Sequence, residues 1–250
     1  MAFLELHEVS VSFSGFLAVD QVSLTVAEGE TRVVIGPNGA GKTTIIDMIT
    51  GKTPPTSGRI SLAGEDITGL SPHEIAGKYG VGRKFQGPNL FDYLTVYENV
   101  EVALAGHSSV LNTFLYRKNR AIADEIKTIL EQINLYGKKD VISTSLSHGE
   151  RQWLEMGMVI AQKPRLITLD EPTAGMTADE TYKTGEMIKT MMKDKTVIVV
   201  EHDIDFVEQI AETVTVLHQG RVLAEGNFAE VKRNPRVVQV YLKDDAGEVA

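Results

Sequence analysis

Apolar and polar side chains alternate along the first part of the chain, and this alternation predicts strands. It is clean over residues 9–13 and 22–26, and it returns over residues 59–62. A period of two is that of a strand with one buried face. Because only a short loop separates the first two segments, we expect them to pair as antiparallel neighbours.

The rest of the chain combines apolar strands with amphipathic helices. Residues 31–35 predict a buried strand that runs into a glycine-rich turn, and residues 43–50 predict a helix closed by Gly51. From about residue 86 to 160 the pattern is helical. One helix face in this region, which we assign to core packing, is formed by Ile122, Ile126, Ile129, Leu130 and Ile133.

Strands and helices then alternate to the end of the chain. The strands are predicted at 166–169, 196–200, 213–217 and 221–224, and the helices near 178–193 and 204–211. Such alternation implies a mainly parallel sheet covered by helices on both faces, and therefore an α/β fold. The helix-rich middle segment is then an inserted lobe.

Composition and charge narrow the classes of protein. The 250 residues are 42% hydrophobic and 24% charged, as in ordinary globular proteins, and the chain has no cysteine. Its net charge of −9 disfavours nucleic acid as a partner. The first nine residues do not have the character of a signal peptide, and no apolar run approaches the roughly 18 residues that span a bilayer. We therefore expect a cytoplasmic chain that reaches a membrane only through a partner.

The glycine-rich turn carries the strongest candidate chemistry. The sequence GPNGAGKT matches in full the phosphate-binding pattern known as Walker A, and it lies between a predicted strand and a predicted helix. Glycines let successive N–H groups point inward at an anion, Lys42 would bridge the β- and γ-phosphates, and Thr43 would offer its hydroxyl to Mg²⁺. The alternative is a plain capped turn. The residues expected to bind ATP here are Gly36, Pro37, Asn38, Gly39, Ala40, Gly41, Lys42, Thr43 and Thr44.

Two adjacent carboxylates end the predicted strand LITLDEP. In a parallel sheet this end of a strand is where ligands bind, and neighbouring side chains point to opposite sides. Asp170 suits Mg²⁺ coordination, and Glu171 suits orientation and deprotonation of an attacking water. His202 ends the next strand and would contact the γ-phosphate and that water. The alternatives are solvated acids at a strand end and a structural histidine.

Two further residues have weaker signals. Gln86, in RKFQGPNLF, lies where the core gives way to the helical lobe, and its side-chain carbonyl would join the Mg²⁺ shell. Taken alone it is an ordinary polar loop residue. Phe13 would stack on adenine, although its strand alternation equally suits the core.

The stretch LSHGE admits two interpretations. Ser147 and Glu150 have the S-x-x-E spacing of a capping box, in which each satisfies a free N–H at the start of a helix. The same helix start, with its positive dipole end, suits an anion that belongs to another molecule. The two interpretations are compatible.

Taken together and in this order, these residues resemble the ATP-binding subunits of ABC transporters over nearly the whole chain. The resemblance implies a P-loop NTPase with ATP and Mg²⁺ as cofactors and with ATP hydrolysis coupled to transport. It implies one ABC ATPase domain over residues 1–250. Its parts would be a RecA-like core with an antiparallel β subdomain (about 1–86 and 160–241), an inserted α-helical lobe (about 87–159) and a flexible tail (244–250).

The resemblance also implies partners. In this family the LSHGE helix faces the γ-phosphate held by the opposite subunit, so Ser147, His148, Gly149 and Glu150 would bind the partner's ATP. A second ATPase subunit, identical or related, is then required. Integral membrane permease subunits would hold the pair on the inner face of the cell membrane, and an extracytoplasmic solute-binding protein would act indirectly. Residues 88–96 would dock a permease helix with Phe91, Tyr93 and Leu94, unless these form a satellite core cluster.

Finer features resemble the branched-chain amino acid and urea branch of importers. The stretches DITGLSPHEIA, GVGRKFQ, LSHGERQWLEMGM and EPTAGMT carry this resemblance. RKFQ, LSHGE, AGMT and VTVLHQGRVLAEG are most similar to urea importers, so urea is the leading cargo and branched-chain amino acids are the alternative.

Two residues depart from the family pattern. His148 replaces a usual glycine, and a protonated imidazole near a phosphate would tune nucleotide affinity modestly. Thr177 stands where many relatives have aspartate, which would alter communication between the two sites.

Two rival functions remain. One is an ABC ATPase that acts on nucleic acid or ribosomes, which the acidic charge and the lack of long insertions disfavour. The other is a regulator that binds ATP without hydrolysing it, which Glu171 and His202 disfavour.

Overall fold

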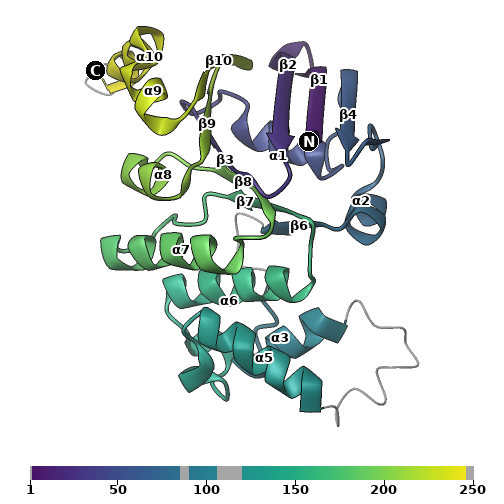
Figure 1. Cartoon of the computed structure of the whole chain (residues 1–250), viewed down its shortest axis with the longest axis vertical. Coiled ribbons are helices and arrows are strands. Elements are labelled where there is room, and N and C mark those ends of the chain that lie inside the picture. The colour runs from purple at the N-terminus through teal and green to yellow at the C-terminus, as the bar shows by residue number, and fades with distance from the viewer. Residues whose placement is uncertain (1, 85–89, 106–119, 246–250) are drawn as a thin grey trace. The chain divides into compact units, whose positions relative to one another are not determined.

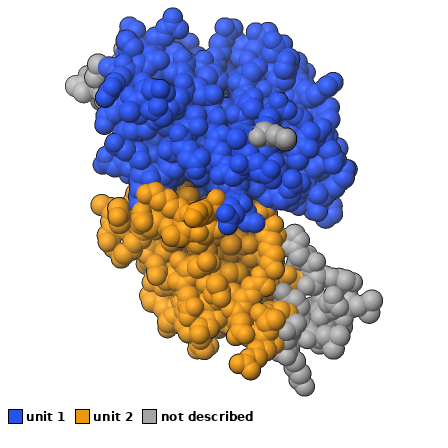
Figure 2. Space-filling model, viewed as in Figure 1, with its two compact units in different colours: residues 1–81, 165–171, 194–250 blue, residues 82–164, 172–193 orange. Residues whose placement is uncertain are grey.

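The computed structural model describes residues 2–84, 90–105 and 120–245. The chain forms two compact units, coloured separately in Figure 2. Unit 1 comprises residues 1–81, 165–171 and 194–250, and unit 2 comprises residues 82–164 and 172–193. In the described part of the chain, every helix is too short or too polar to cross a membrane.

Unit 1 contains an antiparallel sheet with the strand order β2-β1-β4-β5. Figure 1 shows three of its strands side by side. Their bounds are β1 (Ala2–Phe13), β2 (Phe16–Ala27), β4 (Ser57–Leu62) and β5 (Glu65–Asp66). The first two pair antiparallel, as the alternation predicted, but both extend well beyond the predicted segments.

The second sheet has the strand order β10-β9-β3-β8-β7-β6. Its strands are β3 (Thr31–Ile35), β6 (Val81–Lys84), β7 (Leu166–Asp170), β8 (Thr196–Val200), β9 (Thr213–His218) and β10 (Arg221–Gly226), and the boundary between the units lies within β6. β3 runs parallel to β8 and β9, and β7 runs parallel to β8, whereas β10 is antiparallel to β9. Every residue of β7 and β8 is buried, as in a strand covered on both faces.

Several helices of unit 1 begin at a side-chain cap. Their bounds are α1 (Lys42–Ile49), α2 (Pro72–Tyr79), α8 (Ile204–Ile210), α9 (Phe228–Arg233) and α10 (Pro235–Asp245). The sequence analysis did not predict α2, although Ser71 and Glu74 form a capping box, Pro72 begins the helix and Gly80 ends it with φ 68°. The predicted tail begins within α10, and residues 246–250 lie outside the described part.

A buried arginine links both sheets of unit 1. Arg32 of β3 is 4% exposed, and its Nε lies 2.7 Å from Glu30 Oε1. Its Nη1 lies 2.6 Å from Glu225 Oε2 in β10 and donates to Thr215 Oγ1 in β9 at 2.9 Å. Its Nη2 donates to the carbonyl of Thr25 in β2 at 2.9 Å. The strand that leads into the phosphate loop is therefore fixed to three others.

Unit 2 is helical. It contains α3 (Val96–Ala105), α5 (Arg120–Gln132), α6 (His148–Ala161) and α7 (Ala178–Met191). α6 packs against the other three. The predicted core face of α5 is confirmed, with Ile126 and Leu130 fully buried. Residues 172–193, which the sequence analysis placed with the core, belong to this unit, and the predicted division into subdomains stays a prediction.

Candidate active site

The glycine-rich turn joins the end of β3 to the start of α1. Gly36, Gly39 and Gly41 have φ values of 153°, 78° and 100°, a region that only glycine adopts without strain. A Cβ at Gly36 would lie 2.2 Å from the carbonyl oxygen of Leu217, so no larger side chain fits there. The turn therefore has the backbone that an inward-facing ring of N–H groups requires.

The other loop residues surround this backbone. The Ala40 N–H donates to the carbonyl of Pro37 at 3.2 Å. Asn38 and Thr43 are exposed, whereas Ala40 is buried and Thr44 is half-buried. The predicted phosphate-binding loop is thus continuous in space, with Asn38 and Thr43 accessible.

Lys42 lies at the centre of the turn and is only 8% exposed. Its Nζ donates to the carbonyls of Gly36 at 2.6 Å and Pro37 at 2.9 Å. Burial lowers the pKa of Lys42, while the negative charges of three nearby acids, Glu171, Asp170 and Glu201, partly offset that fall. The ammonium group therefore lies in the combined field of three carboxylates.

Asp170 ends β7 and is 1% exposed. Thr43 Oγ1 donates to its Oδ1 at 3.4 Å, so the structure brings together two of the predicted magnesium ligands. Neighbouring ligands of an octahedral Mg²⁺ lie roughly 3 Å apart, since each lies about 2.1 Å from the ion. The oxygens of Thr43 and Asp170 fit such a pair with a small movement. Among the described residues no cluster of three or more His, Cys, Asp or Glu side chains could hold a metal.

Glu171 follows Asp170 with an unusual backbone. Its φ is 46°, in the left-handed region that costs a non-glycine residue free energy, and its N–H donates to the carbonyl of Val200 at 2.9 Å. Its side chain is 26% exposed, while Asp170 is buried. The two acids therefore occupy different environments, as the sequence analysis expected.

His202 follows β8 and is largely exposed. Its Nδ1 lies 3.8 Å from Glu171 Oε1 and 3.7 Å from Glu201 Oε2. Its N–H donates to Glu201 Oε2 at 3.0 Å. Histidine and glutamate thus lie close enough to act on one water molecule, although His202's role stays a prediction.

Glu201 is a site residue that the sequence analysis missed. Its side chain is fully buried, it accepts from the His202 backbone, and its charge acts on Lys42. The signal was present in the sequence, because Glu201 directly follows the strand that precedes His202 and so ends at the same sheet edge as Asp170.

The weaker candidates have separate outcomes. Phe13 pairs with Phe16 at the tip of the β1–β2 hairpin and is 49% exposed, so it is not a core residue. Its stacking on adenine stays a prediction. Gln86 lies outside the described residues.

The LSHGE stretch forms the predicted capping box at the start of α6. Ser147 Oγ accepts from the Glu150 N–H at 3.3 Å, and Glu150 Oε2 accepts from the Ser147 N–H at 3.1 Å. Burial tends to raise the pKa of Glu150, but hydrogen bonds from Lys138, at 2.6 Å, and from Ser147 leave that pKa below its ordinary value. The structural interpretation is confirmed, and the binding of a partner's phosphate stays a prediction.

The two departures from the family pattern both contact their own unit. His148 Nε2 lies 3.0 Å from the carbonyl oxygen of Ala174. Thr177 caps α7, where its hydroxyl accepts from the Glu180 N–H at 3.3 Å and Glu180 Oε2 accepts from the Thr177 N–H at 2.9 Å. Aspartate and threonine are both favoured helix caps, so the threonine keeps this structural role.

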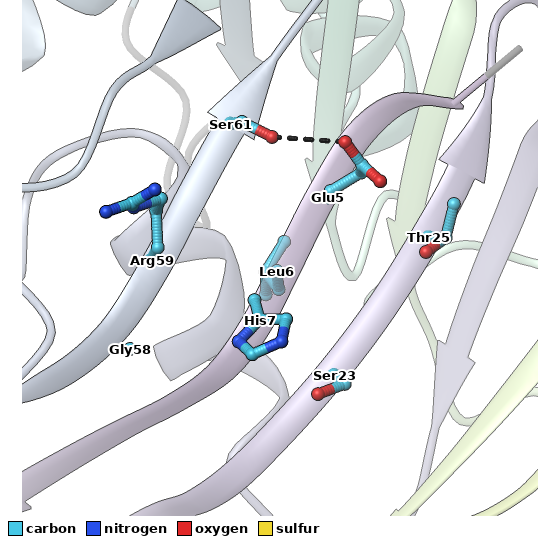
Figure 3. A pocket seen from close by; sticks show the side chains of 8 residues that line it. All are labelled: Glu5, Leu6, His7, Ser23, Thr25, Gly58, Arg59 and Ser61. Carbon is cyan, nitrogen blue, oxygen red and sulfur yellow. Dashed lines mark hydrogen bonds between the residues drawn. The ribbon is translucent and has the colours of Figure 1, made fainter. Parts of the chain in front are cut away.

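A polar hollow lies on the exposed face of the antiparallel sheet (Figure 3). Glu5, His7 and Arg59 line it, and Ser61 Oγ donates to Glu5 Oε2 at 3.3 Å. None of the residues that line the hollow is a predicted site residue. The chemistry gathers instead at the edge of the parallel sheet.

Comparison with known families gives two matches. A family model described as "ABC transporter" matches residues 19–174. A second, described as "Branched-chain amino acid ATP-binding cassette transporter", matches residues 221–242.

Several relatives match over nearly their full length. The chain is 37% identical over 248 residues to the high-affinity branched-chain amino acid transport ATP-binding protein BraF of Pseudomonas aeruginosa, covering 96% of this chain and 97% of that protein. It is 35% identical to LivG of Escherichia coli strain K12 with the same coverage of 96% and 97%. A probable LivG of Archaeoglobus fulgidus is 32% identical, covering 100% and 98%.

Two solved structures are also similar. One is an ATP-binding cassette of an ABC transporter in its ADP conformation, with a TM-score of 0.83, 30% identity and coverage of 97% of this chain and 99% of that chain. The other is a dimeric, post-hydrolysis ATP-binding cassette bound to ADP and Pi, with a TM-score of 0.77, 25% identity and coverage of 90% and 98%.

Proposed function

Because the chain belongs to the ABC transporter family of ATP-binding proteins and is an ATPase of that type, we propose that it powers solute import. The cargo that the relatives favour is a branched-chain amino acid. The observation that carries the proposal is the group formed by Lys42, Asp170, Glu171 and His202 at one edge of the parallel sheet of unit 1.

Each member of this group has a distinct task in the proposed mechanism. The loop N–H groups and Lys42 bind the β- and γ-phosphates. Thr43 and Asp170 would hold Mg²⁺, which when bound neutralises charge on the phosphates. Glu171 orients the attacking water and accepts its proton, and His202 positions that water with it.

The start of α6 completes a second site on another subunit. The chain has one phosphate loop and one LSHGE stretch. Ser147 and the Gly149 N–H lie at a helix N-terminus, whose dipole attracts an anion. A related cassette has been solved as a dimer with ADP and Pi, which supports a pair of ATPase subunits, identical or related, that closes on ATP. Hydrolysis then opens the pair.

The docking surface for a permease subunit is proposed on unit 2. Phe91 and Tyr93 are 47% and 93% exposed. The buried Asn99 fixes their turn, because its Oδ1 accepts from the Phe91 N–H at 2.9 Å and its Nδ2 donates to the carbonyl of Thr95 at 2.9 Å. Exposed aromatic side chains suit a partner's apolar helix. This attachment would hold the chain at the inner face of the membrane, with a solute-binding protein acting indirectly.

Urea is the second candidate cargo. Only RKFQ, LSHGE, AGMT and VTVLHQGRVLAEG favour it, whereas the relatives described above are named for branched-chain amino acid transport. The sequence-based preference for urea is therefore the less well supported of the two.

The test is ATP hydrolysis by the whole complex reconstituted in vesicles. A solute-binding protein loaded with leucine, isoleucine or valine should stimulate hydrolysis, and the urea-loaded counterpart should not. Stimulation by urea alone would reverse the choice of cargo. Hydrolysis that responds to neither, but responds to DNA, RNA or ribosomes, would refute an import function.

A further inference from the structure

We propose that His148 is a positioning residue, which fixes the start of α6 to the segment 172–177. The imidazole Nε2 lies 3.0 Å from the carbonyl oxygen of Ala174, within unit 2. A carbonyl oxygen only accepts hydrogen bonds, so Nε2 carries the proton and donates it. The ring is therefore directed at the protein's own loop, which distinguishes this role from the phosphate contact that the sequence suggested.

Gln152 also lies beside the imidazole, and it is compatible with this tautomer when its amide oxygen faces Nε2. Its side chain is 2% exposed, and its amide nitrogen lies 3.4 Å from His148 Nε2. Two donors would face each other in that arrangement, while Gln152 Oε1 has no hydrogen-bond partner among the described residues. Amide oxygen and nitrogen are assigned from their surroundings, and exchanging the two places an acceptor beside the protonated nitrogen. His148 then has Ala174 as its main acceptor and Gln152 as a secondary one.

Helix α7, which follows the segment, contacts α6 at two further points. A Cβ at Gly149 would lie 2.5 Å from Glu180 Oε1, so the backbone of α6 lies directly against that carboxylate. Trp153 Nε1 donates to Thr184 Oγ1 at 2.9 Å in the core. The Glu180 and Thr184 contacts hold α7, and His148 extends the contact into the loop ahead of it. Of these three contacts, the one made by His148 is with segment 172–177 itself.

The contact between His148 and Ala174 links, along the chain, the residues proposed for two different ATP sites. Segment 172–177 follows Glu171 directly along the chain, and Ser147 precedes His148. His148 thus connects Ser147, which is proposed to face the partner's nucleotide, with the loop that follows Glu171, the residue proposed to orient the attacking water. The effect on hydrolysis rests on the composite site proposed above, whereas the contact with Ala174 does not.

Three variants distinguish the effect of the hydrogen-bond donor of His148 from the effect of its aromatic ring. His148→Gln places an amide nitrogen near the position of Nε2, and His148→Asn stops one methylene short of it. His148→Phe keeps the ring and removes the donor. The first readout is amide hydrogen exchange of the chain alone, at Met176 and Thr177, whose N–H groups are bonded to Thr173 and Glu180.

Loss of one hydrogen bond should speed exchange at these amides about threefold to tenfold in the Asn and Phe variants, and much less in the Gln variant. Amides of β8, in the other unit, provide the internal reference and should exchange at the wild-type rate. Equal exchange at Met176 and Thr177 in all four proteins would overturn the proposal, whatever the cargo.

The second readout is kcat of the reconstituted complex. The Asn and Phe variants should lose about threefold to tenfold in kcat, and the Gln variant should retain most of it. If all three variants lose activity equally, the imidazole itself is required, and a contact with phosphate replaces the positioning role. If none loses activity, the loop contact has no part in hydrolysis and the proposal fails. A wild-type complex that ignores every solute would refute the import function but leave the exchange result standing.

Discussion

Substitution of Arg32 by methionine should destabilise the chain strongly, because it leaves an acid buried without its cation. Glu30 is 11% exposed and lies 2.7 Å from the guanidinium. Removing one partner of a buried ion pair costs about 3–5 kcal/mol. The pair with Glu225 adds less than about 1 kcal/mol, since that carboxylate is 41% exposed. We expect a loss of about 4 kcal/mol in the free energy of unfolding, or roughly 10 °C in Tm for a chain of this length.

The assay is thermal unfolding of the chain followed by circular dichroism. Arg221→Met is the matched comparison, because Arg221 pairs with Asp20 but is 68% exposed, and it should cost less than about 1 kcal/mol. Adding Glu30→Gln to Arg32→Met should recover part of the loss, since no carboxylate is then left buried and unpaired. A fall in Tm of less than about 2 °C for Arg32→Met would refute the argument.

The same pair makes a prediction about pH. Burial favours the protonated form of Glu30, but hydrogen bonds from Arg32 and from the Ala27 N–H outweigh it and lower the pKa of Glu30. A lowered pKa in the folded state contributes stability above the unfolded pKa of about 4.3, and this contribution is lost as pH falls through the folded value. The Tm difference between wild type and Arg32→Met should therefore persist from pH 7 to pH 5 and shrink below about pH 4.3. A difference that stays constant down to pH 3.5 would contradict the assignment.

Three further predictions concern the site and unit 2. Glu171→Gln should lower kcat by roughly 10²- to 10⁴-fold while ATP binding persists and the dimer accumulates, measured by hydrolysis and size-exclusion chromatography; turnover within tenfold of wild type would argue for another base. Gly36→Ala should reduce ATP affinity at least about tenfold in calorimetry, because the added Cβ meets the Leu217 carbonyl. The control Gly77→Ala in α2 has open space around the added Cβ and should be neutral or stabilising by up to about 1 kcal/mol. An equal loss of ATP affinity in both variants would exclude the steric explanation. Trp153→Phe should lower the free energy of unfolding in urea by about 2 kcal/mol, because its hydrogen bond to Thr184 is lost. The same substitution in a Thr184→Val background should cost less. An equal cost in the two backgrounds would show that the bond contributes nothing to stability.

Regular patterns in the sequence predicted most of the fold. The bounds of β3 and β8 were predicted to the residue, because a short apolar run between turn residues leaves little freedom. Helix α2 was missed even though its capping signals, Ser71, Pro72 and Glu74, are plain in the sequence. Strand β6 is only four residues long and has no clear alternation, so local pattern could not identify it.

Sequence analysis proposed the residues of the candidate site where a motif or a strand end marks them, and it missed contacts that depend on the tertiary structure. Lys42, Asp170 and Glu171 follow from their positions along the chain, whereas Glu201 required attention to a buried acid next to the more familiar His202. The partner of His148 could not be predicted, because Ala174 lies 26 residues away and offers only a backbone carbonyl. Residues 172–193 were assigned to the core by sequence order, while their contacts place them with α6.

Lys42 also stabilises the conformation of the glycine-rich turn. Its ammonium group donates hydrogen bonds to the carbonyl oxygens of Gly36 and Pro37, six and five positions earlier in the chain. Replacing this lysine by alanine therefore removes two hydrogen bonds that order the phosphate-binding turn, as well as a positive charge. A deficit in nucleotide affinity in such a variant would combine both losses, and electrostatic attraction alone should not be inferred from it.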